Sequence, residues 1–110
     1  MNIDYHFIND TLVINLPDEE GRLTSSDIDD VIGITLQLSG SSTRAVAVNM
    51  SSKPFLNSNG LGELLKMKDS LLDANIELIL ISPTERVQFL LSLAGVDQFL
   101  RTVNSEGNLS

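Results

Sequence analysis

The sequence predicts a single α/β domain in which a mixed sheet of four to five strands opens with an antiparallel hairpin and packs against three helices. Three observations predict this fold. Two β-prone runs flank an Asn-Asp turn near the start of the chain, and two apolar runs further along each follow a segment with helical periodicity. A clear helix-start pattern follows the second apolar run. The predicted order is therefore β-β-α-β-α-β-α with a weak final strand.

The hairpin is predicted from alternation followed by turn residues. Residues 3–8 alternate apolar and polar side chains, and residues 11–16 form a second β-prone run that Pro17 ends. The two residues between the runs, Asn9-Asp10, are typical of a tight turn. One face of the first strand should carry Ile3, Tyr5 and Phe7.

The first helix follows an acidic segment, residues 18–22, that should be a solvated loop. Ser25 or Ser26 can cap this helix, and Asp27, Asp29 and Asp30 fall in its first turn, where the helix dipole favours negative charge. The helix should end near Ser39-Gly40. Its predicted buried stripe is Ile28, Val31, Ile32, Thr35 and Leu36.

The centre of the chain predicts a β-α-β unit. Residues 45–48 have the composition of a strand covered on both faces, and residues 76–81 form a second run of that kind. A right-handed crossover should make the two strands parallel. The helix between them should end at Asn75, and its predicted apolar face is Leu61, Leu64, Leu65, Leu71 and Leu72.

The third helix has the strongest local signal. Residues 82–85 place Ser82 as a cap, Pro83 at the first helical position and Glu85 where it completes a capping box. Gly95 is placed to end the helix in a left-handed turn. The buried stripe should be Val87, Leu90, Leu91 and Ala94. Residues 99–103 predict a short edge strand. Residues 1–110 should form a single domain, and residues 104–110 should be its frayed end.

Composition narrows the function. The chain has 110 residues, no cysteine, one histidine and a net charge of −8, which repels nucleic acid and anionic lipid. A reducing cytoplasm is the natural setting. No run approaches the ~20 apolar residues that span a bilayer, so neither membrane insertion nor export is expected.

The sequence has none of the common catalytic or metal-binding motifs. It contains no Walker lysine, no serine nucleophile with a plausible histidine base and no metal-ligand cluster. We expect no enzyme activity, no catalytic residue, no metal and no cofactor. His6 should be a surface or structural residue, and the acidic residues of 18–30 a solvated loop and helix start rather than a metal site.

One segment carries more information. Residues 48–62 read Val-Asn-Met-Ser-Ser-Lys-Pro-Phe-Leu-Asn-Ser-Asn-Gly-Leu-Gly. This passage resembles the signature of STAS domains, the family of bacterial anti-sigma factor antagonists, in which a strand ending Asp-Leu-Ser leads through an aromatic residue to Asp-Ser-Ser-Gly-Leu-Gly. The opening hairpin, residues 21–23, the Ser82-Pro83 turn and residues 90–99 extend the resemblance over most of the chain, which implies a STAS-like fold.

The resemblance implies a phosphorylation switch at Ser58. In antagonists of this family a serine at this position is phosphorylated by a kinase that is also the anti-sigma factor, and a PP2C-type phosphatase resets it. The unphosphorylated form binds the kinase and frees the sigma factor. The partner-binding residues would be Asn57, Ser58, Asn59, Gly60, Gly62 and Glu63.

Three differences from the family motif leave other functions open. Asn57 and Asn49 stand where the family has aspartate, and Asn59 replaces the second serine of the motif, so carboxylates are lost at this site. The alternatives are a STAS-like subunit of a larger assembly, such as a lipid-transport complex, that is never phosphorylated, and a small-ligand or nucleotide sensor using residues 58–62 as an anion site. From residue types alone, Ser58 or Asn59 caps the helix.

Overall fold

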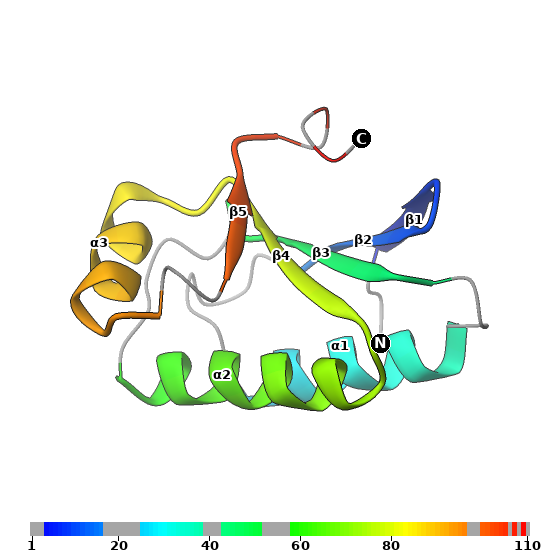
Figure 1. Cartoon of the computed structure of the whole chain (residues 1–110), viewed down its shortest axis with the longest axis horizontal. Coiled ribbons are helices and arrows are strands. Elements are labelled where there is room, and N and C mark those ends of the chain that lie inside the picture. Colours follow the sequence, from blue (N-terminus) through cyan, green and yellow to red (C-terminus); the bar gives the residue numbers. More distant parts are fainter. Residues whose placement is uncertain are drawn as a thin grey trace.

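The computed structural model describes residues 4–16, 25–38, 43–51, 58–96 and 100–105, together with Gly107 and Leu109. Five strands and three helices alternate along these residues, as Figure 1 shows. In chain order they are β1 (Asp4–Ile8), β2 (Thr11–Asn15), α1 (Ser25–Leu38), β3 (Ala45–Asn49), α2 (Ser58–Asp73), β4 (Glu77–Ile81), α3 (Glu85–Leu93) and β5 (Arg101–Val103). The predicted α/β class, hairpin and weak final strand are confirmed.

The strands form one mixed sheet whose spatial order, β1-β2-β3-β4-β5, is also their order in the sequence. β1 pairs with β2 antiparallel, and every later neighbour is parallel. The parallel pairing of β3 with β4 is the crossover unit that the apolar runs predicted. Because β2, β3 and β4 point the same way, their carboxyl ends meet at one edge of the sheet, where both α1 and α2 begin.

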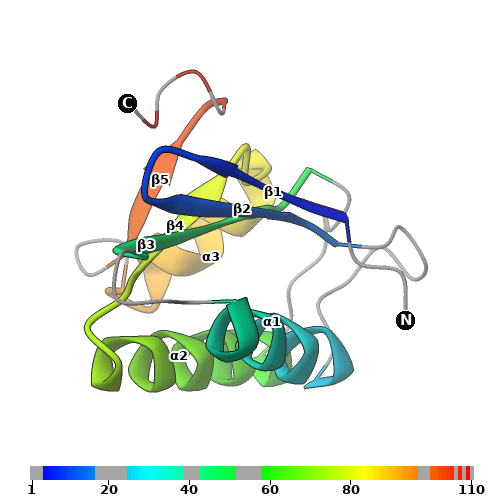
Figure 2. The same ribbon diagram turned by 90° about the vertical axis from the view of Figure 1, so that its right-hand side faces the viewer.

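The helices cover one face of the sheet. α1 and α2 lie side by side beneath it in both views of Figures 1 and 2. Alternate residues of the central strands, such as Leu12, Val46 and Leu80, point into this layer and are fully buried. α3 adds Val87 and Leu91 to the same cluster.

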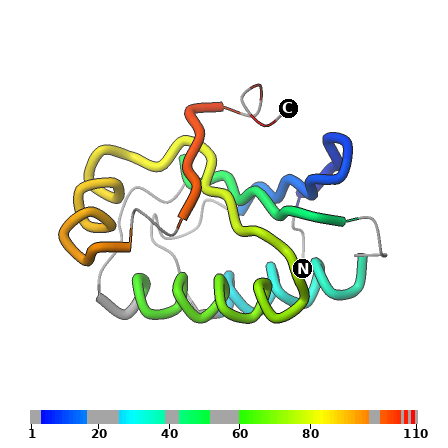
Figure 3. Tube along the Cα trace, viewed as in Figure 1, coloured from blue at the N-terminus to red at the C-terminus, as the bar shows by residue number. Residues whose placement is uncertain are grey.

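The opposite face of the sheet holds a second, smaller apolar cluster. It consists of Val13, Ala45, Ala47, Ile79 and Ile81, with Ile8, Val103 and Leu109 packed against it. Figure 3 shows the C-terminal trace on the side of the sheet away from α1 and α2. Leu109 is partly buried there. The frayed end expected for residues 104–110 stays a prediction.

Two helix ends match the sequence patterns. After α2, Asn75 adopts a left-handed φ of 61° and donates its N–H to Leu72, while Ile76 donates to Leu71. After α3, Gly95 (φ 73°) and Val96 make the equivalent bonds to Ser92 and Leu91. Both ends are Schellman motifs, which satisfy carbonyls that the helices leave unpaired. The predicted closing roles of Asn75 and Gly95 are confirmed.

The start of α3 differs from the prediction. Thr84, not Ser82, is the cap, and its hydroxyl accepts a hydrogen bond from the Val87 N–H at 3.3 Å. Ser82 has a positive φ of 52° and bonds to the end of β5 instead, through its N–H to Val103 and its hydroxyl to Asn104. Glu85 is therefore the first helical residue, and the predicted capping box is wrong.

The predicted stripes are correct at their centres and wrong at their margins. Ile28, Leu64 and Leu91 are buried as expected, whereas Leu65 and Leu90 are only partly buried. Three residues assigned to stripes are exposed: Leu36, Leu72 and Ala94. Met67 is fully buried on α2, although the predicted face of that helix omitted it.

The remaining sequence predictions of local structure have mixed outcomes. Ser25 and Ser26 both lie within the first turn of α1, and of the three aspartates predicted for that turn it contains only Asp27, which is buried. His6 is exposed on β1, as expected of a surface residue. The acidic loop of residues 18–22, the predicted helix end at residues 39–40 and the first part of the predicted edge strand, Phe99, lie outside the described residues.

Candidate functional site

The candidate site lies at the carboxyl edge of the parallel strands, where two asparagines end neighbouring strands. Asn15 is the last residue of β2, and Asn49, the last residue of β3, is its register partner. The Asn49 side-chain nitrogen donates to the Asn15 side-chain oxygen at 3.0 Å. This amide pair ties β2 to β3 at the edge where α2 begins.

Asn49 also shapes the chain that leaves β3. Its Oδ1 accepts two hydrogen bonds from Ser51, one from the backbone N–H at 2.9 Å and one from the hydroxyl at 2.7 Å. A side-chain oxygen that accepts from the backbone two residues on is an Asx turn. Asn49 therefore has a structural role that needs one acceptor and one donor.

α2 begins at Ser58, so the predicted phosphorylation residue occupies the first helical position. The first backbone N–H groups of a helix have no intrahelical acceptor, and the dipole makes this end positive. Asn59 and Gly60 follow in the same turn, and Gly60 is buried. Asn57, which the sequence analysis assigned to partner binding, lies outside the described residues.

Gly62 lies on the exposed surface of α2. A Cβ atom built at this position would meet nothing within 4 Å, and the backbone does not require glycine there. Glycine inside a helix costs about 0.5–1 kcal/mol relative to alanine. Packing within the domain therefore does not account for a glycine at position 62.

Two acidic residues, one on each of α1 and α2, have a buried carboxylate oxygen. Glu63 is half-buried in α2, and its Oε2 is inaccessible to solvent and has no hydrogen-bond partner among the described residues. The same holds for the Asp30 Oδ2 in α1, whose first turn also contains the buried Asp27. α1 and α2 run in the same direction (Figure 1), and both oxygens are buried within the domain.

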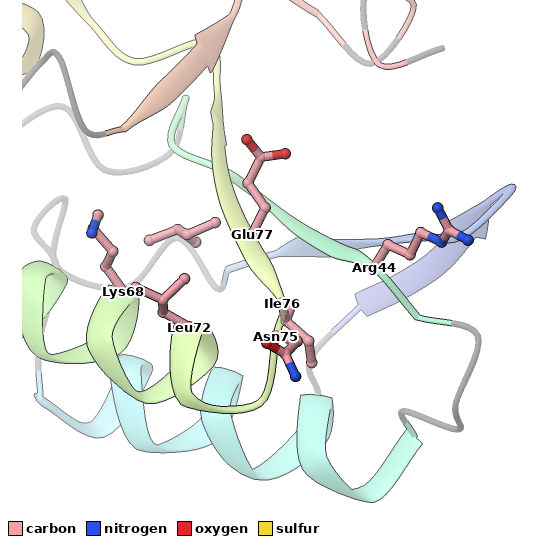
Figure 4. Close-up of a pocket in the computed structure, with 7 residues that line it drawn as sticks. Arg44, Lys68, Leu72, Asn75, Ile76 and Glu77 are labelled. Atoms are coloured by element: carbon pink, nitrogen blue, oxygen red, sulfur yellow. The ribbon is translucent and has the colours of Figure 1, made fainter.

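A hollow of about 460 Å³ lies at the other end of α2. Figure 4 shows Lys68 and Leu72 on α2, Asn75 and Ile76 in the turn after it and Glu77 on β4, while the Arg44 side chain points away from the others. Arg44 pairs with Asp10 at 3.5 Å, and Glu77 with Arg101 at 3.8 Å. The charged groups diverge, so they do not form a convergent ligand site, and sequence reasoning had assigned no role to this hollow.

The described residues form neither a cluster suited to a metal ion nor a helix suited to a membrane. No three His, Cys, Asp or Glu side chains in the described part of the chain converge as a metal site would need. None of the helices that the structure describes has both the length and the hydrophobicity that crossing a membrane requires.

The family is established by comparison of the whole sequence. The model of the STAS domain family matches residues 5–109, from the second residue of β1 to the half-buried Leu109. The chain therefore belongs to the STAS domain family, as the motif at residues 48–62 indicated. A comparison with curated proteins found no match.

Solved structures confirm the fold. A crystal structure of a candidate anti-sigma factor antagonist from Thermotoga maritima superimposes with a TM-score of 0.74 at 17% identity, covering 96% of this chain and 89% of that one. An anti-sigma-factor antagonist (STAS) domain protein from Planctomyces limnophilus gives a TM-score of 0.73 at 17% identity, covering 97% and 94%. At this identity the likeness establishes the STAS fold.

Proposed function

We propose that this protein is a cytoplasmic anti-sigma factor antagonist that binds an anti-sigma factor with serine kinase activity and is released when that kinase phosphorylates Ser58. A PP2C-type phosphatase resets the switch. The protein regulates transcription indirectly and makes no contact with nucleic acid. The observation that carries the proposal is the position of Ser58 in a STAS domain, at the first residue of α2.

The physical chemistry of the helix start supports this role for Ser58. A phosphate placed there meets unpaired backbone N–H groups and the positive end of the dipole, which favours the phosphorylated domain by about 0.3–1 kcal/mol. The same group adds a charge of about −1.5 to −2 to a surface that already has buried acidic oxygens on Glu63 and Asp30. Phosphorylation would therefore preserve the fold while weakening partner binding, because the phosphate lies beside acidic residues and must be desolvated in the interface.

The surface around Ser58 supports a protein partner. Gly62 leaves a smooth exposed patch on α2, which lets a partner's backbone approach closely. Glu63, one position further on, is half-buried and adds an acidic side chain beside this patch. We assign partner binding to the first two turns of α2, which include Asn59, and to Asn57, which precedes the helix in the sequence.

A second candidate is a STAS domain that binds a partner constitutively, as a subunit of a larger assembly. The Asn15–Asn49 amide pair favours it. A neutral strand end held by an amide donor provides no carboxylate for phosphoryl transfer, whereas kinase-regulated relatives in the family have aspartate at position 49 and at position 57. Both candidates use the same surface and differ in whether Ser58 is modified.

Two measurements separate these functions. We expect the intact mass of the protein from its native cells to include one phosphate, which Ser58→Ala removes. Titration against the kinase should show that Ser58→Asp weakens binding at least tenfold, roughly 1.4 kcal/mol, while Ser58→Ala binds as wild type does. Ser26→Asp is the matched control, because it adds a charge to the first turn of α1 and should bind nearly normally.

Gly62→Ala tests the surface independently of phosphate. The variant should raise the free energy of unfolding by about 0.5–1 kcal/mol and still weaken partner binding, because the added methyl group lies on the proposed contact surface. A native protein without phosphate, together with wild-type binding by Ser58→Asp, would rule out the switch. If Gly62→Ala binds the partner as tightly as wild type does, the surface of α2 around Gly62 is not part of the interface.

A further inference from the structure

β1 forms one free edge of the sheet and carries two half-exposed aromatic side chains. Tyr5 is 44% exposed and Phe7 46%. Their register partners on β2, Ile14 and Leu12, are fully buried in the larger core cluster. Because opposite residues of an antiparallel pair share a face, the two rings extend this apolar layer to the edge of the sheet.

The backbone groups of the same two residues point outward. The two-residue turn at Asn9-Asp10 makes Ile8 and Thr11 a hydrogen-bonded pair. Such pairs alternate along an antiparallel ladder, so His6 and Asp4 also bond to β2, whereas Tyr5 and Phe7 do not. The Asp10 carbonyl agrees with this assignment, because it accepts from the Arg44 N–H at 2.9 Å and so faces β3, which turns the next residue, Thr11, toward β1.

The two edges of the sheet differ in their protection. β5 has three residues and begins with the exposed Arg101, and short charged edges resist pairing with another strand. β1 has five regularly paired residues, with neither proline nor lysine and Asp4 as its one acidic residue. The outer edge of β1 therefore presents a complete and nearly uncharged strand.

We propose that β1 pairs with β1 of a second copy of this chain, antiparallel and centred on His6. In this register Tyr5 of each copy lies opposite Phe7 of the other. Both are hydrogen-bonded pairs, so every outward N–H and C=O of Tyr5 and Phe7 finds a partner, and the four aromatic rings meet on one face. The two five-stranded sheets join into one continuous sheet.

The sequence of β1 selects a second copy as the occupant. The register centred on His6 pairs all the outward groups of both strands, whereas a shift by two residues leaves one outward residue of each copy opposite a residue beyond β1. The register centred on His6 also places Asp4 of one copy opposite Ile8 of the other, so the two Asp4 carboxylates do not face each other. His6 of each copy lies opposite His6 of the other at the two-fold axis.

The dimer leaves the proposed partner surface open. In Figure 1, β1 lies at the opposite end of the long axis from the first turn of α2. The inference rests on β1 alone and stands or falls independently of phosphorylation at Ser58. Each dimer would carry two separate α2 surfaces.

Sedimentation velocity of the full chain at pH 8 tests the proposal. In about 0.15 M NaCl, which screens the charge of −8 on each copy, the mass should shift from monomer toward dimer between roughly 10 μM and 1 mM protein, the range of a small interface. Tyr5→Lys and Phe7→Lys should each weaken dimerisation at least tenfold. Phe89→Lys is the matched control, because Phe89 is 65% exposed on α3 and should have no effect.

Amide hydrogen exchange of the wild-type chain supplies a test that needs no variant. The Tyr5 and Phe7 amides should exchange rapidly in dilute protein and slow down as the concentration rises, while the His6 amide is protected throughout by its bond to β2. A monomer over the whole concentration range would overturn the proposal. So would a dimer in which the Tyr5 and Phe7 amides still exchange rapidly, or one that survives both lysine variants.

Discussion

Asn49 makes three hydrogen bonds with one side chain, and each needs a particular atom. Its nitrogen donates to Asn15, and its oxygen accepts twice from Ser51. Aspartate at this position keeps the acceptor for Ser51, and the Asn15 amide can turn over to donate to the second carboxylate oxygen. Leucine has neither function.

We therefore predict that Asn49→Leu lowers the free energy of unfolding by about 1–3 kcal/mol, because it leaves half-buried polar groups unpaired. Asn49→Asp should change it by less than about 1 kcal/mol. Urea unfolding measures both variants, and equal destabilisation by the two would show that the amide pair does not hold the strands. Asn49→Asp also restores the family residue at this position, so it is the variant in which to compare phosphate transfer to Ser58.

Single-residue assignments were the least predictable part of the fold. The segment Ser82-Pro83-Thr84-Glu85 matches a capping box by type and spacing, yet Thr84 also matches the rules for a cap. The choice of cap depends on β5, about twenty residues further along, because the carbonyl of its last residue, Val103, accepts a hydrogen bond from the Ser82 N–H at 2.8 Å. Local pattern contains no information about that long-range bond.

At the scale of elements, α3 offers a matched pair of leucines. Leu91 is 1% exposed and packs into the larger core cluster, while Leu93, two residues on, is 68% exposed. We predict that Leu91→Ala lowers the free energy of unfolding by about 2–5 kcal/mol through lost burial and a residual cavity. Leu93→Ala should change it by about 0.5 kcal/mol or less.

Chemical denaturation of the two variants, with m-values compared, checks this prediction. An unchanged urea midpoint for Leu91→Ala would mean that α3 does not pack as described. A large loss for Leu93→Ala would instead place that exposed face of the helix in a contact, since the isolated domain offers it none.

Helix and strand types followed from periodicity, but the width of each buried stripe did not. α1 and α2 each bury a narrow stripe against the sheet and against one another, which leaves Leu36 and Leu72 beyond its margin. The period of the pattern reports the direction of the buried face and not how much of the helix circumference neighbouring elements cover. Met67 was missed because the leucines alone already satisfied the pattern.

At the scale of the whole molecule, the charge of −8 governs encounters with a partner. Glu63 lies within the proposed partner surface on α2. Steering of a basic partner by such a field accelerates association more than it deepens affinity. We predict that raising the salt from about 0.05 to 0.5 M slows association with the kinase markedly and changes dissociation little.

Stopped-flow or surface-based kinetics at several salt concentrations measures this effect. A parallel titration with an uncharged cosolute of equal viscosity separates screening from slower diffusion. An association rate that does not respond to salt would contradict steering and leave shape complementarity as the source of the rate.

Part of the strand arrangement could be anticipated from the sequence, but the covering of the second sheet face could not. Two β-prone runs predict the hairpin, two apolar runs predict the central strands, and the right-handed crossover rule places β4 beside β3. Nothing in residues 104–110 has a recognisable period, so the packing of Leu109 against Ala45, Ala47 and their neighbours had no local signal. It depends on where the tail returns after β5.

The identity of strand order in space and along the chain has a consequence for synthesis. A ribosome releases β1 and β2 first, and each later strand then emerges with its only earlier neighbour already available. No strand has to wait for, or insert between, segments made afterwards, so every strand after β2 is added at the same growing edge while the outer edge of β1 stays unchanged. Nascent chains stalled once Asn49, Ile81 or Val103 has emerged from the ribosome should therefore gain protease resistance in successive steps, with β5 added last.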